Sequence, residues 1–189
     1  MVEPGPTGQL PSDIDVGLTL SSPRSVKTLL IVWWSVTGAS RALADAAEAA
    51  ARASEPGLRV MKIRCDQAGI RDLLNADALI LVCPEMLGSI AGMMKDFFDR
   101  TYYPALDGLA GKPYALMVSA GSDGCGAVRQ VERIVTGWRL RQVAPALIAC
   151  THAQSPAAIQ ADKQLPRSVL DEADALGAML AHGLVMGVW

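Results

Sequence analysis

The hydrophobic and polar positions of this 189-residue chain follow two alternating patterns. Five short runs are mostly apolar, as expected of strands that are covered on both faces of a sheet. These runs lie at residues 29–33, 58–64, 77–83, 112–119 and 144–150. The segments between and after them show helical spacing of apolar residues and predict helices at residues 40–53, 70–75, 90–102, 127–137 and 166–184.

This β-α alternation predicts an α/β fold, a three-layer doubly wound sandwich around a five-stranded parallel sheet. The expected strand order is 2-1-3-4-5, and the second run, which has mixed faces, is expected near an edge. In such sheets, ligands bind beyond the carboxyl ends of the strands, next to the point where the strand order reverses. We therefore expect the loops after the first, third and fourth strands to lie close together.

The loop after the first strand, residues 35–40, reads SVTGAS and opens a helix that is rich in alanine. Its three hydroxyl side chains and one glycine lie where a helix N-terminus leaves unpaired amides and a positive dipole end, which favours an anion. A single N-capping hydroxyl is the simpler alternative for such a loop. The loop has neither G-x-G-x-x-G nor Gly-Lys-Ser/Thr, so a phosphate monoester held by hydroxyls and amides is the expected ligand.

Two more loops complete the candidate site. Pro84 is expected to end the third strand, and the loop at residues 85–89 follows it; the fourth strand leads into AGSDGCG at residues 120–126. For any one of the three loops alone, a turn is the favoured explanation, but three unusual loops at one end of the sheet predict a shared ligand site. The candidate binding residues are Ser35, Val36, Thr37, Gly38, Ala39, Ser40, Pro84, Glu85, Met86, Leu87, Gly88, Ser119, Ala120, Gly121, Ser122, Asp123 and Gly124.

Composition limits the classes of protein that remain. About half of the residues are hydrophobic, which predicts a globular fold, and the formal net charge of −2 gives no reason to expect nucleic acid as a partner. No apolar run reaches the length of a membrane span, and the N-terminus lacks the features of a signal peptide. Residues 1–26, with four prolines and no clear period, are expected to form a flexible tail before a single domain at residues 27–189.

The cysteines and histidines show no metal-binding spacing. Cys65, Cys83, Cys125 and Cys150 form no C-x-x-C pair, and reduced thiols in the cytoplasm are expected. Cys125 is the one cysteine in a glycine-rich loop, where a catalytic thiol is an unfavoured alternative. His152 follows the fifth strand and is interpreted either as a surface histidine or as a donor to a quinone oxygen or a nicotinamide phosphate.

Three stretches resemble the flavodoxin-like NAD(P)H-dependent FMN reductases and quinone oxidoreductases. Residues 35–41 read SVTGASR, which is similar to the family pattern S-x-T-G-x-[ST] followed by Arg. ADALI at residues 76–80 and PEMLGSIAGMMKDFFDR at residues 84–100 resemble the second and longest family stretch. LAGKP at residues 109–113, followed by a strand and a glycine-rich loop, resembles the third.

The resemblance implies FMN as the cofactor, held by the three loops, and NADH or NADPH as the electron donor. It further implies a quinone, flavin or similar small acceptor, no metal, and a homo-oligomer, either a dimer or a tetramer. Where the family usually carries an aromatic residue two positions after the proline, this chain has Met86. Glu85 is expected to bring a negative charge close to the flavin.

Two other functions remain open. A flavodoxin-type electron carrier would use the same cofactor, but such carriers are usually strongly acidic and this chain is not. A non-enzymatic member that uses the fold for interaction is the second alternative, because fold does not imply function.

Overall fold

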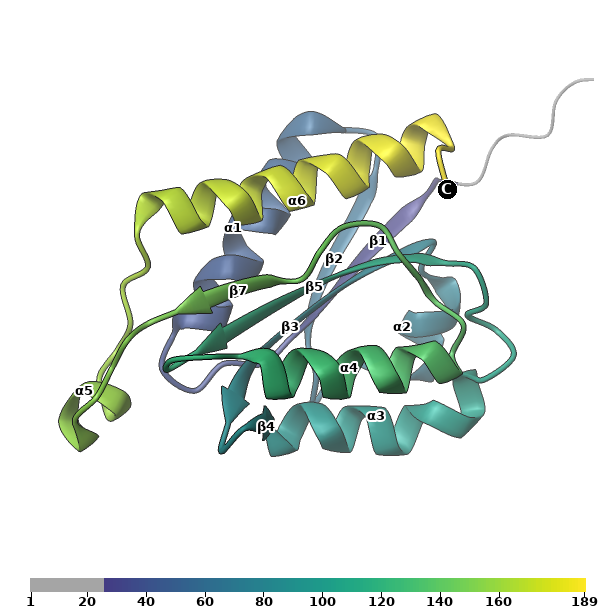
Figure 1. The fold of residues 1–189 in the computed structure, drawn as a ribbon. Helices are drawn as coiled ribbons and strands as arrows, with labels where there is room; N and C mark the ends of the chain where they lie inside the picture. The colour runs from purple at the N-terminus through teal and green to yellow at the C-terminus, as the bar shows by residue number, and fades with distance from the viewer. Residues whose placement is uncertain (1–25) are drawn as a thin grey trace, which may run out of the picture.

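The computed structural model describes residues 26–189 and shows one sheet with helices on both of its faces (Figure 1). The predicted tail at residues 1–26 lies, except for Val26, outside the described residues. The strands are β1 (Thr28–Trp33), β2 (Arg59–Arg64), β3 (Ala78–Met86), β4 (Ser89–Ile90), β5 (Pro113–Ala120), β6 (Arg141–Gln142) and β7 (Leu147–Cys150). The helices are α1 (Ala39–Ser54), α2 (Ile70–Asn75), α3 (Gly92–Ala105), α4 (Cys125–Gly137), α5 (Pro156–Gln160) and α6 (Arg167–Met186).

The sheet has the strand order that the sequence predicts. Its path is β2-β1-β3-β5-β6, with β7 also paired to β5, and all of these pairings are parallel. The five predicted strands correspond to β2, β1, β3, β5 and β7, so the order 2-1-3-4-5 is confirmed. β2 lies at one edge, as its mixed faces indicated.

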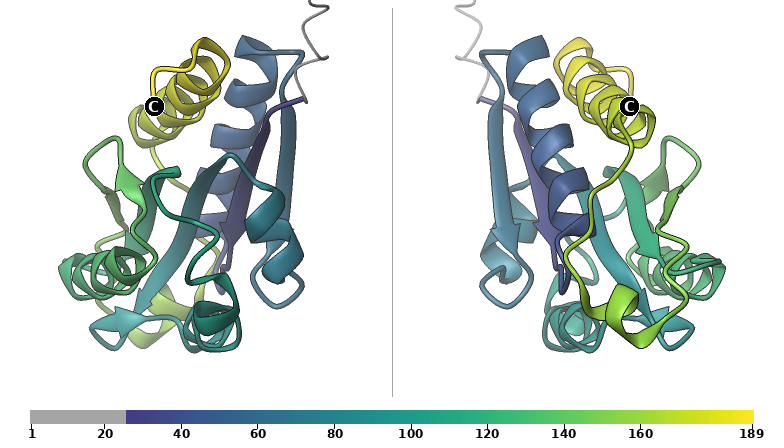
Figure 2. Two further views of the ribbon diagram at one scale, coloured as in Figure 1. Left: turned by 90° about the vertical axis from the view of Figure 1, so that its right-hand side faces the viewer. Right: turned by 90° about the vertical axis from the view of Figure 1, so that its left-hand side faces the viewer.

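Two hydrophobic cores lie on the two faces of the sheet, because successive strand residues point to opposite sides. Leu30 and Val32 face a core that Phe97, Phe98 and Trp138 fill from α3 and from the end of α4. On the other face, α1 packs against α6. α1 lies over β1, β3 and β5, and α6 lies over β3, β5 and β7. Figure 2 shows these three layers edge-on.

The expectation that Pro84 ends the third strand is wrong. β3 continues to Met86, turns at Leu87 and Gly88, and pairs antiparallel with β4. The reason lies in the neighbouring strand: β1 ends at Trp33, which is paired with Val82. Backbone groups two residues apart point to the same side of a strand, and the Val82 carbonyl accepts from the Trp34 amide on the β1 side. The nitrogen of Pro84 therefore faces the space beyond the end of β1, where no strand carbonyl requires an N–H donor.

The segment after β7 is the other main difference from the expected elements. A polar loop was expected there, whereas the structure contains the short helix α5 within residues 151–165, here called the strap. The strap lies beyond the carboxyl ends of β5 and β7, at the left edge of the sheet in Figure 1. None of the helices in residues 26–189 has the length and apolar character needed to cross a membrane.

Candidate functional site

The loop between β1 and α1 is shaped by Gly38. This residue has φ +90°, a left-handed conformation that strains other residues, and it precedes the first helical residue. The Ser35 hydroxyl accepts a hydrogen bond from the Gly38 amide at 3.0 Å, which closes the turn. The first turn of α1 contains no acidic residue, and no side chain caps its amides. This helix N-terminus therefore has the chemistry of an anion-binding site.

Ser40 has a different place from the other hydroxyl residues of this loop. Its side chain is 1 % exposed, and its hydroxyl lies 2.7 Å from the hydroxyl of Ser119 at the end of β5. One of the two hydroxyls donates to the other inside the protein, and this hydrogen bond ties the start of α1 to the sheet. The Ser40 side chain thus faces inward, and this residue offers only its backbone to a ligand in the loop.

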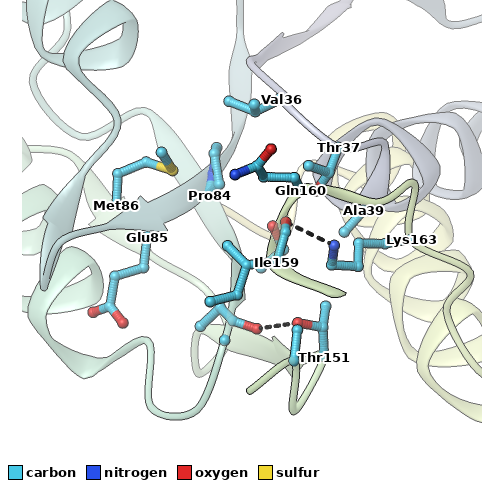
Figure 3. Close-up of a pocket in the computed structure, with 14 residues that line it drawn as sticks. Val36, Thr37, Ala39, Pro84, Glu85, Met86, Thr151, Ile159, Gln160 and Lys163 are labelled. Carbon is cyan, nitrogen blue, oxygen red and sulfur yellow. Dashed lines mark hydrogen bonds between the residues drawn. The ribbon is translucent and has the colours of Figure 1, made fainter. Parts of the chain in front are cut away.

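Glu85 does not point into the space between the three loops. Its carboxylate accepts three hydrogen bonds from the backbone amides of Gly124, Gly126 and Ala127, at 2.9, 3.1 and 3.2 Å. Figure 3 shows the side chain directed away from Thr37, Gln160 and the other labelled side chains. The N-terminus of α4 thus binds the carboxylate, while Glu85 still lines the cavity, and the expected negative charge near a ligand stays a prediction.

Further contacts fix the β3–β4 hairpin on α4. The side-chain oxygen of Gln130 accepts from both the Ser89 hydroxyl, at 2.6 Å, and the Ile90 amide, at 3.0 Å. Gly126 packs so closely that a Cβ added there would lie 2.1 Å from the Gly88 carbonyl oxygen. The hairpin and the glycine-rich loop consequently form one rigid wall of the site.

A cavity of about 300 Å³ lies between this wall, the loop after β1 and the strap (Figure 3). Its volume falls in the range of small-molecule sites. The predicted residues that line it are Val36, Thr37, Ala39, Pro84, Glu85, Met86, Ser119, Ala120 and Gly121. The three loops that the sequence singled out thus meet at one cavity.

Other predicted residues lie elsewhere. Ser35 and Gly38 line a neighbouring cavity, and Leu87 is fully exposed at the tip of the hairpin. The lining of the 300 Å³ cavity does not include Ser40, Leu87, Gly88, Ser122, Asp123 or Gly124. His152 is exposed and absent from this lining; its amide donates to the Gly121 carbonyl, and its role as a donor to a ligand stays a prediction.

The strap supplies the residues that sequence reasoning missed. Thr151, Ala153, Ile159, Gln160 and Lys163 complete the lining of the cavity. A signal for α5 was present: Ser155-Pro156 is a typical N-cap followed by proline at the first helical position. In the structure, the Ser155 hydroxyl accepts from the Ala158 amide at 3.2 Å. What the sequence did not reveal is that this helix folds back over the site.

Both ends of the strap are attached to loops of the site. The Thr151 amide donates to the Ala120 carbonyl, and the Lys163 amide donates to the Thr37 carbonyl, each at 2.8 Å. Between these anchors, α5 has no buried residue. The Lys163 side chain binds carbonyls at the end of α5, including those of Ala158 and Ile159. The strap is therefore a self-contained cover over the cavity.

Cys65, Cys83 and Cys125 lack the properties of an activated nucleophile. Burial raises the pKa of Cys65 to about 11 and that of Cys83 to about 12. Cys125 is exposed, and its hydrogen bond to Asp123 raises its pKa as well. Reactive cysteines need a lowered pKa, so a thiol mechanism at the glycine-rich loop is disfavoured.

The topology and the position of the cavity define a flavodoxin-like protein. Among solved structures, the chain is similar to the flavodoxin of Streptococcus pneumoniae TIGR4, with a TM-score of 0.64 and 22% identity over 82% of this chain and 98% of that one. For an oxidoreductase of Corynebacterium diphtheriae, the TM-score is 0.65 and the identity 19%, over 85% of this chain and 98% of that one. For the WrbA-like protein of Agrobacterium tumefaciens, the TM-score is 0.60 and the identity 17%, over 85% of this chain and 98% of that one.

The family profile of the NADPH-dependent FMN reductases matches residues 66–154. This range contains the β3–β4 hairpin, the glycine-rich loop and the first part of the strap, so the resemblance seen in the sequence is confirmed. No curated protein sequence gives a significant match. The family match together with the fold supports a flavin-binding oxidoreductase or electron carrier.

Proposed function

We propose that this protein binds FMN and passes electrons from NADH or NADPH to a quinone, a flavin or another small acceptor. The observation that carries the proposal is the position of the cavity of about 300 Å³. It lies at the carboxyl ends of β1, β3 and β5 and includes the loop at the N-terminus of α1. This is where doubly wound sheets bind their ligands, and a helix N-terminus suits a phosphate group.

The residues present fit FMN in chemistry. The hydroxyl of Thr37 and the first-turn amides of α1, starting with Ala39, would hold the phosphate. Pro84, Met86 and Ile159 provide apolar walls on different sides of the cavity, and a methionine sulfur packs well on an aromatic ring. The α4 amides that bind the Glu85 carboxylate offset part of its repulsion of an electron-rich ring.

Bound FMN would supply the redox chemistry, so no protein nucleophile is needed. The task of this chain is to orient the ring and to limit its contact with water. The hairpin wall, fixed on α4 by Glu85 and Gln130, gives the orientation. The strap covers the cavity with Ile159 and Gln160 and lowers the access of water. The donor's nucleotide, the acceptor, a homo-oligomeric state and a cytoplasmic location stay predictions.

A flavodoxin-type carrier is the second candidate, since the described chain resembles complete flavodoxin chains with 98% of their length covered. The two functions differ in one measurable property. A reductase oxidises NADH or NADPH by itself when a quinone or free flavin is supplied, whereas a carrier needs a separate reductase. The steady-state rate at which the protein oxidises NADH or NADPH, followed by the absorbance of the reduced nicotinamide, distinguishes them.

The binding proposal is tested by titrating the flavin-free protein with FMN and riboflavin. Thr37→Ala should weaken FMN about tenfold to a hundredfold, because it removes a hydrogen bond to a charged group, and should leave riboflavin nearly unchanged. Thr136→Ala on α4, whose hydroxyl donates to the Glu132 carbonyl, is the matched control. A protein that binds neither flavin, or an equal loss for both ligands, contradicts the phosphate site.

A further inference from the structure

A second cavity of about 450 Å³ lies on the other side of the loop after β1. It shares Val36 and Thr37 with the first cavity, and it extends toward the end of β2 at Arg64. Asp162 of the strap forms part of the opposite wall. A flavin whose phosphate lies in the loop after β1 would have its ring in the first cavity. The second cavity then provides space for a group attached to the same phosphate.

Two arginines from different elements face this second cavity. Arg41 is in the first turn of α1, and its Nε lies 3.6 Å from the Asp45 carboxylate. Arg64 is paired with Asp66 through Nε and Nη2. Within residues 26–189, no hydrogen bond involves either Nη atom of Arg41 or the Nη1 atom of Arg64. Both guanidinium groups therefore keep donors for an anion, and planar guanidinium groups bind phosphate well.

The phosphate monoester was expected from the sequence of the loop alone. In the structure, Arg41 and Arg64 also line the cavity beside this loop. The two arginines are 23 residues apart in sequence, and only the parallel pairing of β1 with β2 brings them together. Lys163 also lines the cavity, but its ammonium group is bound by carbonyls of α5, so it adds little to the attraction of an anion.

The remaining walls suit a nucleoside. Trp33 is half-buried and also lines the cavity, and an indole ring is a group on which a base can stack. The Asp162 carboxylate is a hydrogen-bond acceptor for ribose hydroxyls and would repel a second phosphate attached to that ribose. Aromatic ring, carboxylate and two arginines thus occur together around one space.

We propose that the second cavity is a subsite for an adenosine 5′-diphosphate unit with an unmodified ribose. Its phosphates bind Arg41 and Arg64 beside the loop after β1, its ribose hydroxyls donate to Asp162, and its base lies against Trp33. The proposal deepens the proposed function, because such a unit occurs in FAD and in NADH. The unmodified ADP unit distinguishes FAD and NADH from FMN, which ends at one phosphate, and from NADPH, whose adenosine ribose carries a further phosphate.

The test is titration calorimetry on the full chain, with ADP as the probe. We expect ADP to bind the flavin-free protein, and Arg41→Gln and Arg64→Gln each to weaken it roughly tenfold, the effect of one lost charged hydrogen bond. Arg52→Gln is the control for Arg41. Arg52 is on the same helix and also pairs with an acidic residue four positions away, but it does not line the cavity. Arg59→Gln, at the other end of β2, is the control for Arg64.

2′,5′-ADP should bind less tightly than ADP, and Asp162→Asn should reduce that preference.

The same titrations distinguish the two sources of the unit. FAD binding more tightly than FMN, with only FAD weakened by the two arginine variants, supports a dinucleotide flavin. ADP that binds alongside FMN supports a nicotinamide donor. Failure of ADP to bind up to about 1 mM, or an equal loss of ADP affinity in all four arginine variants, overturns the proposal. Failure of FMN and riboflavin to bind, with ADP bound as expected, would instead contradict the proposed function.

Discussion

Two helix N-termini, those of α1 and α4, open toward the same end of the sheet and have the same backbone shape. Each is preceded by a glycine in the left-handed conformation, Gly38 with φ +90° and Gly124 with φ +81°. Neither glycine can cap its helix with a side chain. They differ in what satisfies the first amides: Glu85 binds those of α4, whereas no side chain binds those of α1.

This difference separates a helix N-terminus whose anion the protein supplies from one at which we propose that a ligand phosphate binds. At α4 the protein supplies the anion itself, and the carboxylate joins the hairpin to the glycine-rich loop. At α1, Arg41 brings a positive charge to the first turn, and Ala39 and Gly38 line two different cavities. A glycine-rich loop before a helix is therefore informative only when it is known whether an acidic residue of the same chain fills it.

The largest expected effect comes from Gly126→Ala, which pushes the hairpin away from α4. The new Cβ would lie 2.1 Å from the Gly88 carbonyl oxygen, and backbone on both sides limits relaxation. We expect the free energy of unfolding to fall by about 2–3 kcal/mol, although alanine is the better helix former. Gly121→Ala, with no atom within 4 Å of its Cβ, is the control in the same urea denaturation. Equal stability of the two variants would contradict the rigid wall.

Glu85→Ala tests directly whether the carboxylate makes α4 different from α1. Removing three hydrogen bonds to a charged group at a helix N-terminus should destabilise the protein by about 2 kcal/mol. Glu85→Gln keeps the shape and should have a smaller effect. If the comparison is right, added phosphate should recover part of the stability of Glu85→Ala, because its free α4 amides can then bind an anion. Phosphate that stabilises wild type and variant equally would speak against this.

Gly38→Ala should strain the loop before α1 without a steric clash. The nearest atom to its Cβ is the Lys163 carbonyl oxygen at 3.9 Å, so the penalty arises from the left-handed φ alone and should be about 1 kcal/mol. Gly57→Ala, at an open position outside the left-handed region, is the control. FMN affinity should fall in Gly38→Ala and remain in Gly57→Ala. Unchanged FMN affinity in both variants would show that the shape of this turn does not matter for binding.

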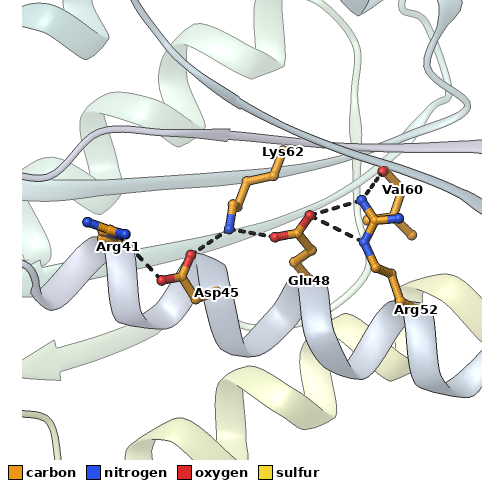
Figure 4. Close-up of polar contacts among 6 residues, drawn as sticks. All are labelled: Arg41, Asp45, Glu48, Arg52, Val60 and Lys62. Atoms are coloured by element: carbon orange, nitrogen blue, oxygen red, sulfur yellow. Dashed lines mark hydrogen bonds and ion pairs between the residues drawn. The ribbon is translucent and has the colours of Figure 1, made fainter.

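The smallest effect is expected along the side of α1, where ion pairs attach the helix to β2 (Figure 4). Lys62 bridges Asp45 and Glu48, and Arg52 pairs with Glu48 at 2.9 Å. Burial raises the pKa of Glu48, but its hydrogen bonds from Lys62 and Arg52 outweigh burial and hold it below the ordinary 4.5.

A carboxyl group with a lowered pKa stabilises the fold above its unfolded-state value and loses this contribution as pH falls through its folded-state value. Glu48→Gln should therefore lower the free energy of unfolding by less than about 1 kcal/mol at neutral pH. This difference from wild type should shrink below about pH 4.5. Thermal unfolding across this range measures it, with the exposed Glu172→Gln of α6 as control. A difference that does not change with pH would assign the effect to packing.

The sequence predicts the sheet well because its information is local. Apolar runs such as residues 29–33 and 77–83 fixed the strands, and short loops limited their order. The three loops at the site could be found in the same way, since parallel strands end on the same side of a sheet.

What could not be predicted depends on contacts between distant residues. The direction of Glu85 is set by amides 39 to 42 positions away, and Ser40 faces Ser119 across 79 positions. Pro84 is tolerated inside β3 because a different strand ends early, which its own neighbours in sequence do not reveal. The strap could be recognised as a helix, but its position over the cavity follows only from its anchors on Thr37 and Ala120.

The buried pair of Ser40 and Ser119 has a consequence for how this site can change over evolutionary time. Loss of one hydroxyl leaves the other buried without its partner, whereas replacement of both by alanine can be nearly neutral. Single changes at either position are thus selected against, and the two positions are expected to covary among homologous sequences. Serine at both positions or small apolar residues at both should be common, and mixed pairs rare, so this pair records which substitutions the start of α1 and the end of β5 accept together.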